Sequence, residues 1–238
     1  EARPFAFNVS DAGHRASTLR KVPLTCLPVM LAVLLPWTVD AQQALTNGFN
    51  LDAALAIGGT DSYTLAAQAG DQVILHLAKL SGGAAFAPRI QVSTPDGTEL
   101  VQDSDAVEAR VHVQAPVTGN YAVRVSDANG TGAGNYRLRL AQVPGAFAVP
   151  TGDEGGALTN GASHQGTIDT GDLGLWTIAA TAGARLTVQI SELSGGAGFT
   201  PKIELFGPDG VPLGSDSDQI AARIDVQAAV AGTYTVLV

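Results

Sequence analysis

The feature that most constrains the fold is a duplication within the chain. A shift of 113 positions places Leu45-Thr46-Asn47-Gly48 on Leu158-Thr159-Asn160-Gly161, and the match runs without a gap to Val125 and Val238. About 35 of roughly 81 aligned residues are identical, far more than chance provides. A repeat of this length is too long for a solenoid unit and has the size of a small domain. The chain therefore contains two copies of one module.

The duplication divides the chain into four parts. We expect an N-terminal extension with a secretory signal peptide at 1–41, a first module at 42–142, a Pro- and Gly-rich linker at 143–156 and a second module at 157–238. The second copy stops at Val238, which matches Val125, whereas the first copy continues to a further strand at Asn135–Ala141. We therefore expect the second module to lack its last strand and the natural protein to continue beyond Val238.

Short alternating apolar runs separated by turn residues predict an all-β fold. Turns recur every 8–12 residues or so, which is typical of β-sandwiches, and no stretch after residue 45 has a sustained helical period. The expected fold is two tandem antiparallel β-sandwich modules, jelly-roll-like and of about eight strands each, preceded by a signal-peptide helix. In the first copy the clearest strands are Tyr63–Ala67, Val73–Leu77, Arg89–Ser93, Glu99–Val101, Val111–Val113, Tyr121–Val125 and Asn135–Ala141, and 80–87 is expected to be a loop.

The N-terminal segment has the pattern of a secretory signal. Basic residues at Arg15, Arg20 and Lys21 precede an apolar stretch, Val22–Trp37, and small or apolar residues lead to a cleavage site after Ala41. Two alternatives are an uncleaved anchor helix and lipidation of Cys26, the only cysteine; Thr25 before it is not the small residue that lipidation needs. The signal predicts a secreted, extracellular or cell-surface protein with no membrane segment after cleavage.

The charge balance narrows the possible partners. The formal net charge is -9 at pH 7, and binding to phosphate backbones needs clustered Lys and Arg, so nucleic acid and anionic membranes are not expected partners. Cleavage after Ala41 leaves no cysteine, which excludes disulfides and thiol chemistry from the mature chain. A divalent cation remains compatible with this composition.

The order of motifs in each copy resembles the bacterial pre-peptidase C-terminal domain. In copy one these motifs are Gly58-x-x-Asp61-x-Tyr63, Ala69-Gly70, Pro95-Asp96-Gly97, a short acidic cluster, Gly119-x-Tyr121 and Asn135-Tyr136-Arg137-Leu138. Copy two departs from this order, because Gly174 replaces Asp61 and Trp176 replaces Tyr63. The resemblance implies a non-catalytic sandwich that is appended to secreted enzymes, often peptidases, or present in tandem; some members bind Ca²⁺ or a polymer.

The Asp-Ser-Asp triplets are the candidate metal ligands. Asp103 and Asp105 lie two residues apart on one side of an extended segment, and the second copy repeats them as Asp216 and Asp218. Such hard oxygen ligands suit Ca²⁺, which needs six to eight of them, and the resemblance suggests the linker carboxylates Asp153 and Glu154 as additions. The alternative is a polar hairpin loop in which the Asp side chains cap backbone amides.

Other chemistry-bearing side chains have simpler interpretations. His76, His112 and His164 show neither zinc-ligand spacing nor a triad, and no nucleophile elbow is present. Aromatic residues near turns could form a sugar-binding platform or pack in the cores, and the scarcity of aromatic residues favours packing; these residues are Tyr63, Tyr121, Trp176 and Tyr234.

The expected function follows from this absence of catalytic motifs. We expect a non-catalytic accessory or binding segment of an extracellular protein, such as one that carries a peptidase or hydrolase elsewhere. Its partners would be an extracellular polymer or protein, or further domains of the same chain. The alternatives are a structural stalk or adhesion repeat, and an enzyme active within this stretch.

Overall fold

A computed structural model describes residues 42–194 and 198–238, which belong to one compact unit. The expected signal-peptide helix, its cleavage site and Cys26 lie outside these residues. Within them every regular element is a strand, β1 to β16, and the fold is all-β. A membrane-crossing helix is absent from this described part of the chain.

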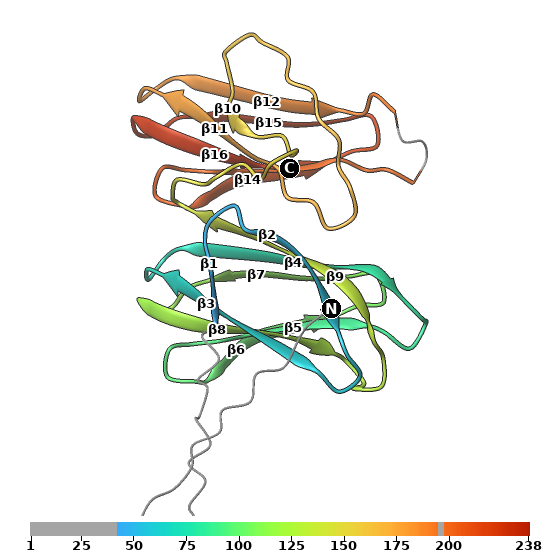
Figure 1. Ribbon diagram of the computed structural model, residues 1–238. Helices are drawn as coiled ribbons and strands as arrows, with labels where there is room; N and C mark the ends of the chain where they lie inside the picture. The colour runs from blue at the N-terminus through green and yellow to red at the C-terminus, as the bar shows by residue number, and fades with distance from the viewer. Residues whose placement is uncertain (1–41, 195–197) are drawn as a thin grey trace, which may run out of the picture. The chain divides into compact units, whose positions relative to one another are not determined.

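The first module is a sandwich of two sheets (Figure 1). One has the order β1-β3-β8-β5-β6 and the other the order β2-β9-β4-β7. The bounds are β1 Gln43–Leu45, β2 Asn50–Leu55, β3 Thr60–Ala67, β4 Gln72–Gly82, β5 Pro88–Ser93, β6 Glu99–Ser104, β7 Glu108–Gln114, β8 Gly119–Asp127 and β9 Gly134–Val143.

Alternation along the strands builds the core between these sheets, as the sequence predicts. Val73, Leu75 and Leu77 of β4 share one face with the apolar side chains of β9 and are buried against those of β3, β5 and β8. A chain of hydroxyls crosses this core: Tyr63 is 2.6 Å from the hydroxyl of Tyr136, which donates to Asp61 at 2.6 Å. These hydrogen bonds offset the free-energy cost of burying the hydroxyl groups in an apolar core.

The second module repeats part of this plan (Figure 1). Its larger sheet has the order β10-β11-β16-β13-β14, and its other sheet contains only β12 and β15. The bounds are β10 Gly156–Ala157, β11 Leu175–Ala180, β12 Arg185–Ser191, β13 Lys202–Phe206, β14 Pro212–Ser217, β15 Ala221–Gln227 and β16 Gly232–Leu237. The 113-residue shift equates β12 with β4 and β15 with β7.

Three details differ from the expected strands. β1 and β2 were not among them, and β1 pairs in parallel with β3, as β10 does with β11, so the sandwiches are not wholly antiparallel. β4 continues to Gly82, where a loop was expected from residue 80. The cause is pairing across a bulge, which places Ser81 opposite Asn135 and Gly82 opposite Gly134.

Candidate functional site

The outer faces of two sheets meet at a junction between the modules. An outer face is the side of a sheet turned away from its own sandwich core. Ile74 of β4 and Ala141 and Val143 of β9 belong to a buried apolar cluster that is separate from the core of the first module. The other members of this cluster come from the second module or the segment before β11, with Phe147 packed against them: Leu173, Leu175, Phe206 and Leu237.

Apolar residues occur on these outer faces only where the modules meet. At the equivalent positions of the other copy, Phe206 becomes Ser93, Leu237 becomes Arg124 and Ile74 becomes the exposed Thr187. The same holds for Leu175, which becomes Ser62. Burying a large apolar side chain contributes about 1.5–3 kcal/mol, so the junction is a substantial source of stability. The two sheet faces turned away from the junction are polar.

Two turn glycines allow the modules to approach closely. A Cβ on Gly171 would lie 2.3 Å from Cβ of Ala78, and one on Gly210 would lie 2.5 Å from Cδ of Pro144. Both glycines have φ of +79°, a conformation that L side chains rarely adopt. The backbone turns of the second module therefore pack directly on β4 and on the start of the linker.

A buried ion triad lies beside the apolar cluster. The Nη1 group of Arg139, on the outer face of β9, donates to Asp153 of the linker and to Asp172 just before β11. All three side chains are 7% exposed. Burial and the nearby Asp153 raise the pKa of Asp172, although Arg139 acts in the opposite direction. One guanidinium thus joins three segments of the chain.

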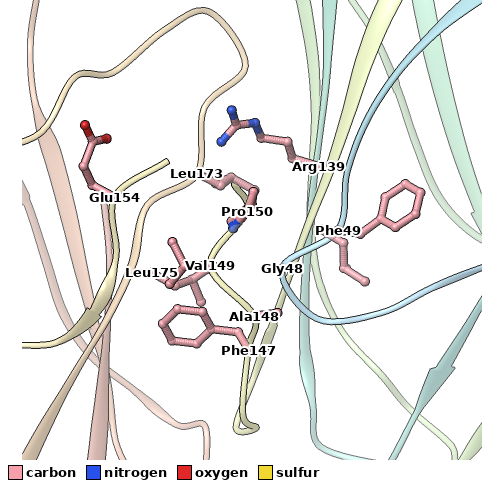
Figure 2. A pocket seen from close by; sticks show the side chains of 11 residues that line it. Gly48, Phe49, Arg139, Phe147, Ala148, Val149, Pro150, Glu154, Leu173 and Leu175 are labelled. Carbon is pink, nitrogen blue, oxygen red and sulfur yellow. The ribbon is translucent and has the colours of Figure 1, made fainter. Parts of the chain in front are cut away.

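Figure 2 shows the linker at this junction, with Phe147 and Val149 beside Leu175. The hollow that these residues line has a volume of ≈ 10 Å³, room for about one water molecule. At another place on the junction, Nδ1 of His112 lies 3.7 Å from Oε2 of Glu204, and its ring centroid is 6.0 Å from that of Phe206. At these two places the contact between the modules is formed by packed protein side chains.

The predicted acidic residues lie elsewhere. Asp103 and Asp216 are near the ends of β6 and β14, and Asp105 and Asp218 lie in the connections from these strands to β7 and β15. Asp105 Oδ1 accepts hydrogen bonds from the backbone of Val107 at 2.7 Å and Glu108 at 3.1 Å. Asp103 Oδ2 accepts one from the backbone of Arg110 at 2.7 Å. The bonds to Asp105 lower the pKa of its carboxyl, that from Val107 most strongly. Such bonds are those expected of Asp side chains that cap the backbone amides of a loop, but this loop connects two sheets and is not the predicted hairpin, because β6 and β7 do not pair.

The second copy has the same loop geometry. Asp218 accepts from the backbone of Ile220 at 2.7 Å and Ala221 at 3.0 Å, and Asp216 accepts from Arg223 at 2.7 Å. Bonds from Ala221 and then Ile220 lower the pKa of Asp218. Among the described residues, no group of three or more His, Cys, Asp or Glu is arranged to hold a metal. Calcium at these four aspartates stays a prediction.

Two further observations bear on that prediction. The open hollow that Asp103 lines, ≈ 290 Å³, is also lined by Arg89, whose charge repels a cation. Asp153, suggested as an additional ligand, is instead bound to Arg139. Glu154 lines the junction hollow.

The remaining candidate side chains have structural roles. Tyr63, Tyr121 and Tyr234 are buried, so they cannot form a binding platform. Trp176 is half-buried and packs edge-on against His164, with ring centroids 5.2 Å apart. Nδ1 of His76 lies 2.9 Å from Glu108, and the described contacts of the histidines place none of them in a triad.

Sequence reasoning did not identify the junction. Its signal was the set of positions at which the two copies disagree: apolar in one copy, polar in the other, and all on strand faces turned away from the cores. Arg139 and Asp172 carried no such signal, because the counterpart of Asp172 is Gly59 and Arg139 lies beyond Val125, where the aligned stretch ends.

The chain was compared with known proteins. No protein-family profile matches it, and no curated protein matches its sequence. Among solved structures it is similar to the pre-peptidase C-terminal domain of a collagenase from Bacillus anthracis, with 12% identity, a TM-score of 0.36 and coverage of 42% of this chain and 93% of that one. It is also similar to dimeric latent PorU from Porphyromonas gingivalis, with 8% identity, a TM-score of 0.25 and coverage of 84% of this chain and 21% of that one. Likenesses of this strength assign no role to the chain.

We predict that Arg139→Met lowers the free energy of unfolding by about 3–5 kcal/mol, because Asp153 and Asp172 are left buried without a counter-charge. The matched control is Arg137→Met on the same strand. Its partner Asp52 is 51% exposed, so we expect a loss of about 0–1 kcal/mol. Urea unfolding of the full chain measures both. The Arg139 deficit should shrink as the pH falls, because burial raises the pKa of Asp172 and its protonation removes an uncompensated buried charge. Equal losses for the two variants would contradict a structural triad.

Calcium binding at the Asp-Ser-Asp turns predicts a rise in the melting temperature. At free Ca²⁺ about 100-fold above the dissociation constant, mass action adds about 2.7 kcal/mol to the stability of the folded chain. Calorimetry with added Ca²⁺ and with a chelator makes the comparison. If the melting curves with Ca²⁺ and with chelator were identical, calcium binding would be contradicted, and these aspartates would only cap the backbone amides of their loops.

Proposed function

We propose that residues 42–238 form a non-catalytic accessory segment of a secreted protein, in which two β-sandwiches act as one rigid support. The partner it carries or binds is an extracellular polymer, another protein or a further domain of the same chain, such as a peptidase or hydrolase. The signal pattern at 1–41 supports secretion, and the motif order of each copy supports the accessory role.

The observation that carries this proposal is the confinement of apolar residues to the two outer faces that meet. A segment that only spaces other domains needs no fixed angle between its modules. Here the apolar cluster and the triad of Arg139, Asp153 and Asp172 fix one arrangement. A rigid pair holds whatever is attached to its two ends, or bound on its polar faces, at a constant separation and orientation.

The outer faces of the sheets give less support to the alternative function, a structural stalk. A stalk that continued through this contact would need a second apolar outer face, in the manner of repeat proteins whose inner repeats bury both sides. The outer faces of β12 and β15 are instead polar and exposed, as their residues Arg185, Thr187, Gln189, Arg223, Asp225 and Gln227 show. The two modules therefore offer no second apolar face of this kind to which a further module could add.

Phe206→Ser tests whether the modules form one rigid body. Serine is the residue that the first copy has at this position, Ser93, so the sandwich itself tolerates it. We expect the wild-type chain to unfold in one calorimetric transition and the variant to lose about 3 kcal/mol or more and unfold in two. The matched control, Val211→Thr, also introduces the residue of the first copy, Thr98, but at a position that is 48% exposed, and should change little.

Two separate transitions in the wild-type chain would contradict the rigid pair. Hydrolysis of peptide or polysaccharide substrates by the purified chain would contradict the non-catalytic role. If the wild-type chain hydrolysed a substrate and Phe206→Ser did not, the catalytic activity would depend on the junction.

The closed pair also predicts the state of association. We expect the sedimentation coefficient of the wild-type chain to stay constant as its concentration rises. The reason is that neither outward-facing sheet face offers an apolar surface for end-to-end association. Analytical ultracentrifugation across a 100-fold range of concentration, roughly 1–100 μM, makes the measurement. End-to-end oligomers that grow with concentration would favour the stalk.

A further inference from the structure

One sheet in each module ends in a strand that is paired on one side only. Among the described residues β7 pairs with β4 alone, and its counterpart β15 pairs with β12 alone. The sides of β7 and β15 away from these partners are called the free edges. The first module also contains β9 and β2, and β7 still ends its sheet, so the free edge belongs to the plan of the module. Such an edge is a template on which another strand can form.

Backbone bonds at the two ends of β7 fix which of its amides point to the free edge. The carbonyl of Val107 accepts from Lys79 N at 2.8 Å, and Ala115 N donates to the carbonyl of Asp71 at 2.8 Å, so the backbones of Val107 and Ala115 face β4. Successive residues of an antiparallel strand direct their backbone groups to alternate sides. The outward amides are therefore those of Glu108, Arg110, His112 and Gln114 in β7 and, from the corresponding bonds of Ile220 and Ala228, those of Ala221, Arg223, Asp225 and Gln227 in β15.

The aspartates of each triplet occupy the first two outward amides. In the first module Glu108 N donates to Oδ1 of Asp105 at 3.1 Å, and Arg110 N donates to Oδ2 of Asp103 at 2.7 Å. The second module repeats both bonds 113 residues further along the chain. The carbonyls of an incoming strand therefore find no free donor in this half of either edge. The amides left uncapped span only residues 112–114 of β7, which is shorter than a typical strand of about five residues.

Large apolar side chains lie exposed beside the capped amides in both modules. Val107, directly before β7, is 58% exposed, and its counterpart Ile220 is 78% exposed. Leu80 is 41% exposed and its counterpart Leu193 is 74% exposed, and the residue before each leucine donates its amide to Val107 or Ile220. None of the four belongs to a described core cluster. Association along the free edges would bury this apolar surface and be favoured by that burial.

We propose that the free edges of β7 and β15 are surfaces that fit a second copy of this chain, and that the aspartates of the two triplets keep them closed. Two copies of one edge can pair in antiparallel fashion about a two-fold axis, so that each free amide meets a carbonyl of the equivalent strand. Without Asp103, the free amides of β7 extend from Arg110 to Gln114, the length of an ordinary strand. The triplets thus have a role that needs no bound metal.

Two double variants of equal net charge test this role. Asp103→Ala with Asp216→Ala removes the side-chain acceptors, whereas Asp103→Asn with Asp216→Asn removes the same charges and keeps an oxygen that accepts from the amide. Sedimentation is measured over roughly 1–100 μM in buffer that contains a chelator. We expect the Ala variant to form oligomers that grow with concentration, because each chain then has two open edges. The Asn variant and the wild-type chain should not associate.

Single variants sharpen the test and replace the double variant if it does not fold. Asp103→Ala or Asp216→Ala opens one edge, so we expect its association to stop at a dimer. Circular dichroism in the near ultraviolet, on dilute samples, shows whether each variant keeps its folded core.

Hydrogen exchange identifies the surface that associates. In dilute solution the amides of Arg110 and Arg223 should exchange about tenfold or more faster in the Ala variant than in the wild-type chain, because their caps are absent. At high concentration the same amides, with those of His112 and Asp225, should exchange more slowly again, because an added strand bonds them.

Three results would overturn the proposal: a folded Ala variant that does not associate, equal association of the Asn variant, or association that leaves the exchange of these amides unchanged. Wild-type oligomers that slow the same amides would show that the edges are open without any change. None of these outcomes concerns the single calorimetric transition that tests the rigid pair, so the two proposals stand or fall separately.

Discussion

The constraint on which the arrangement depends is that a sheet has two faces and an apolar face must be buried. In the sheet β2-β9-β4-β7, one face is covered by its own sandwich. The other face has Ile74, Ala141 and Val143, which only another folded unit can cover. Residues on both faces of β4 are therefore buried, as is typical of strands inside layered structures. The position of the second module and the course of the linker follow from this requirement.

Apolar burial is non-directional, so by itself it holds the modules together without selecting one angle. Hydrogen bonds are directional. Arg139 joins a strand of the first module to the linker and to the start of the second, so its two bonds are satisfied together only in a narrow range of orientations. The apolar cluster thus contributes most of the stability of the junction, and the ion triad contributes most of its specificity.

Much of the fold could be predicted because period-two alternation is local. The strands around Val73–Leu77, Tyr121–Val125 and Asn135–Ala141 are confirmed, and their inward faces are those that alternation assigns. β1 and β10 are short and pair in parallel with strands distant in sequence, so no local pattern indicates them. For the Asp-Ser-Asp triplets the sequence left two alternatives, calcium ligands and loop caps; the capping bonds are present, and calcium stays a prediction. The junction could not be predicted from the residues that the two copies share, because its apolar residues lie where the copies differ.

Two properties of the protein follow from the sequence alone: the chain holds two copies of one all-β module, and the cores form from alternating residues. These properties depend on patterns within a strand or between copies. Two others are visible only in the folded chain: which outer faces meet, and that Arg139 bridges Asp153 and Asp172. Those features depend on contacts between residues far apart in the chain, and burial of an outer face is decided by what folds against it.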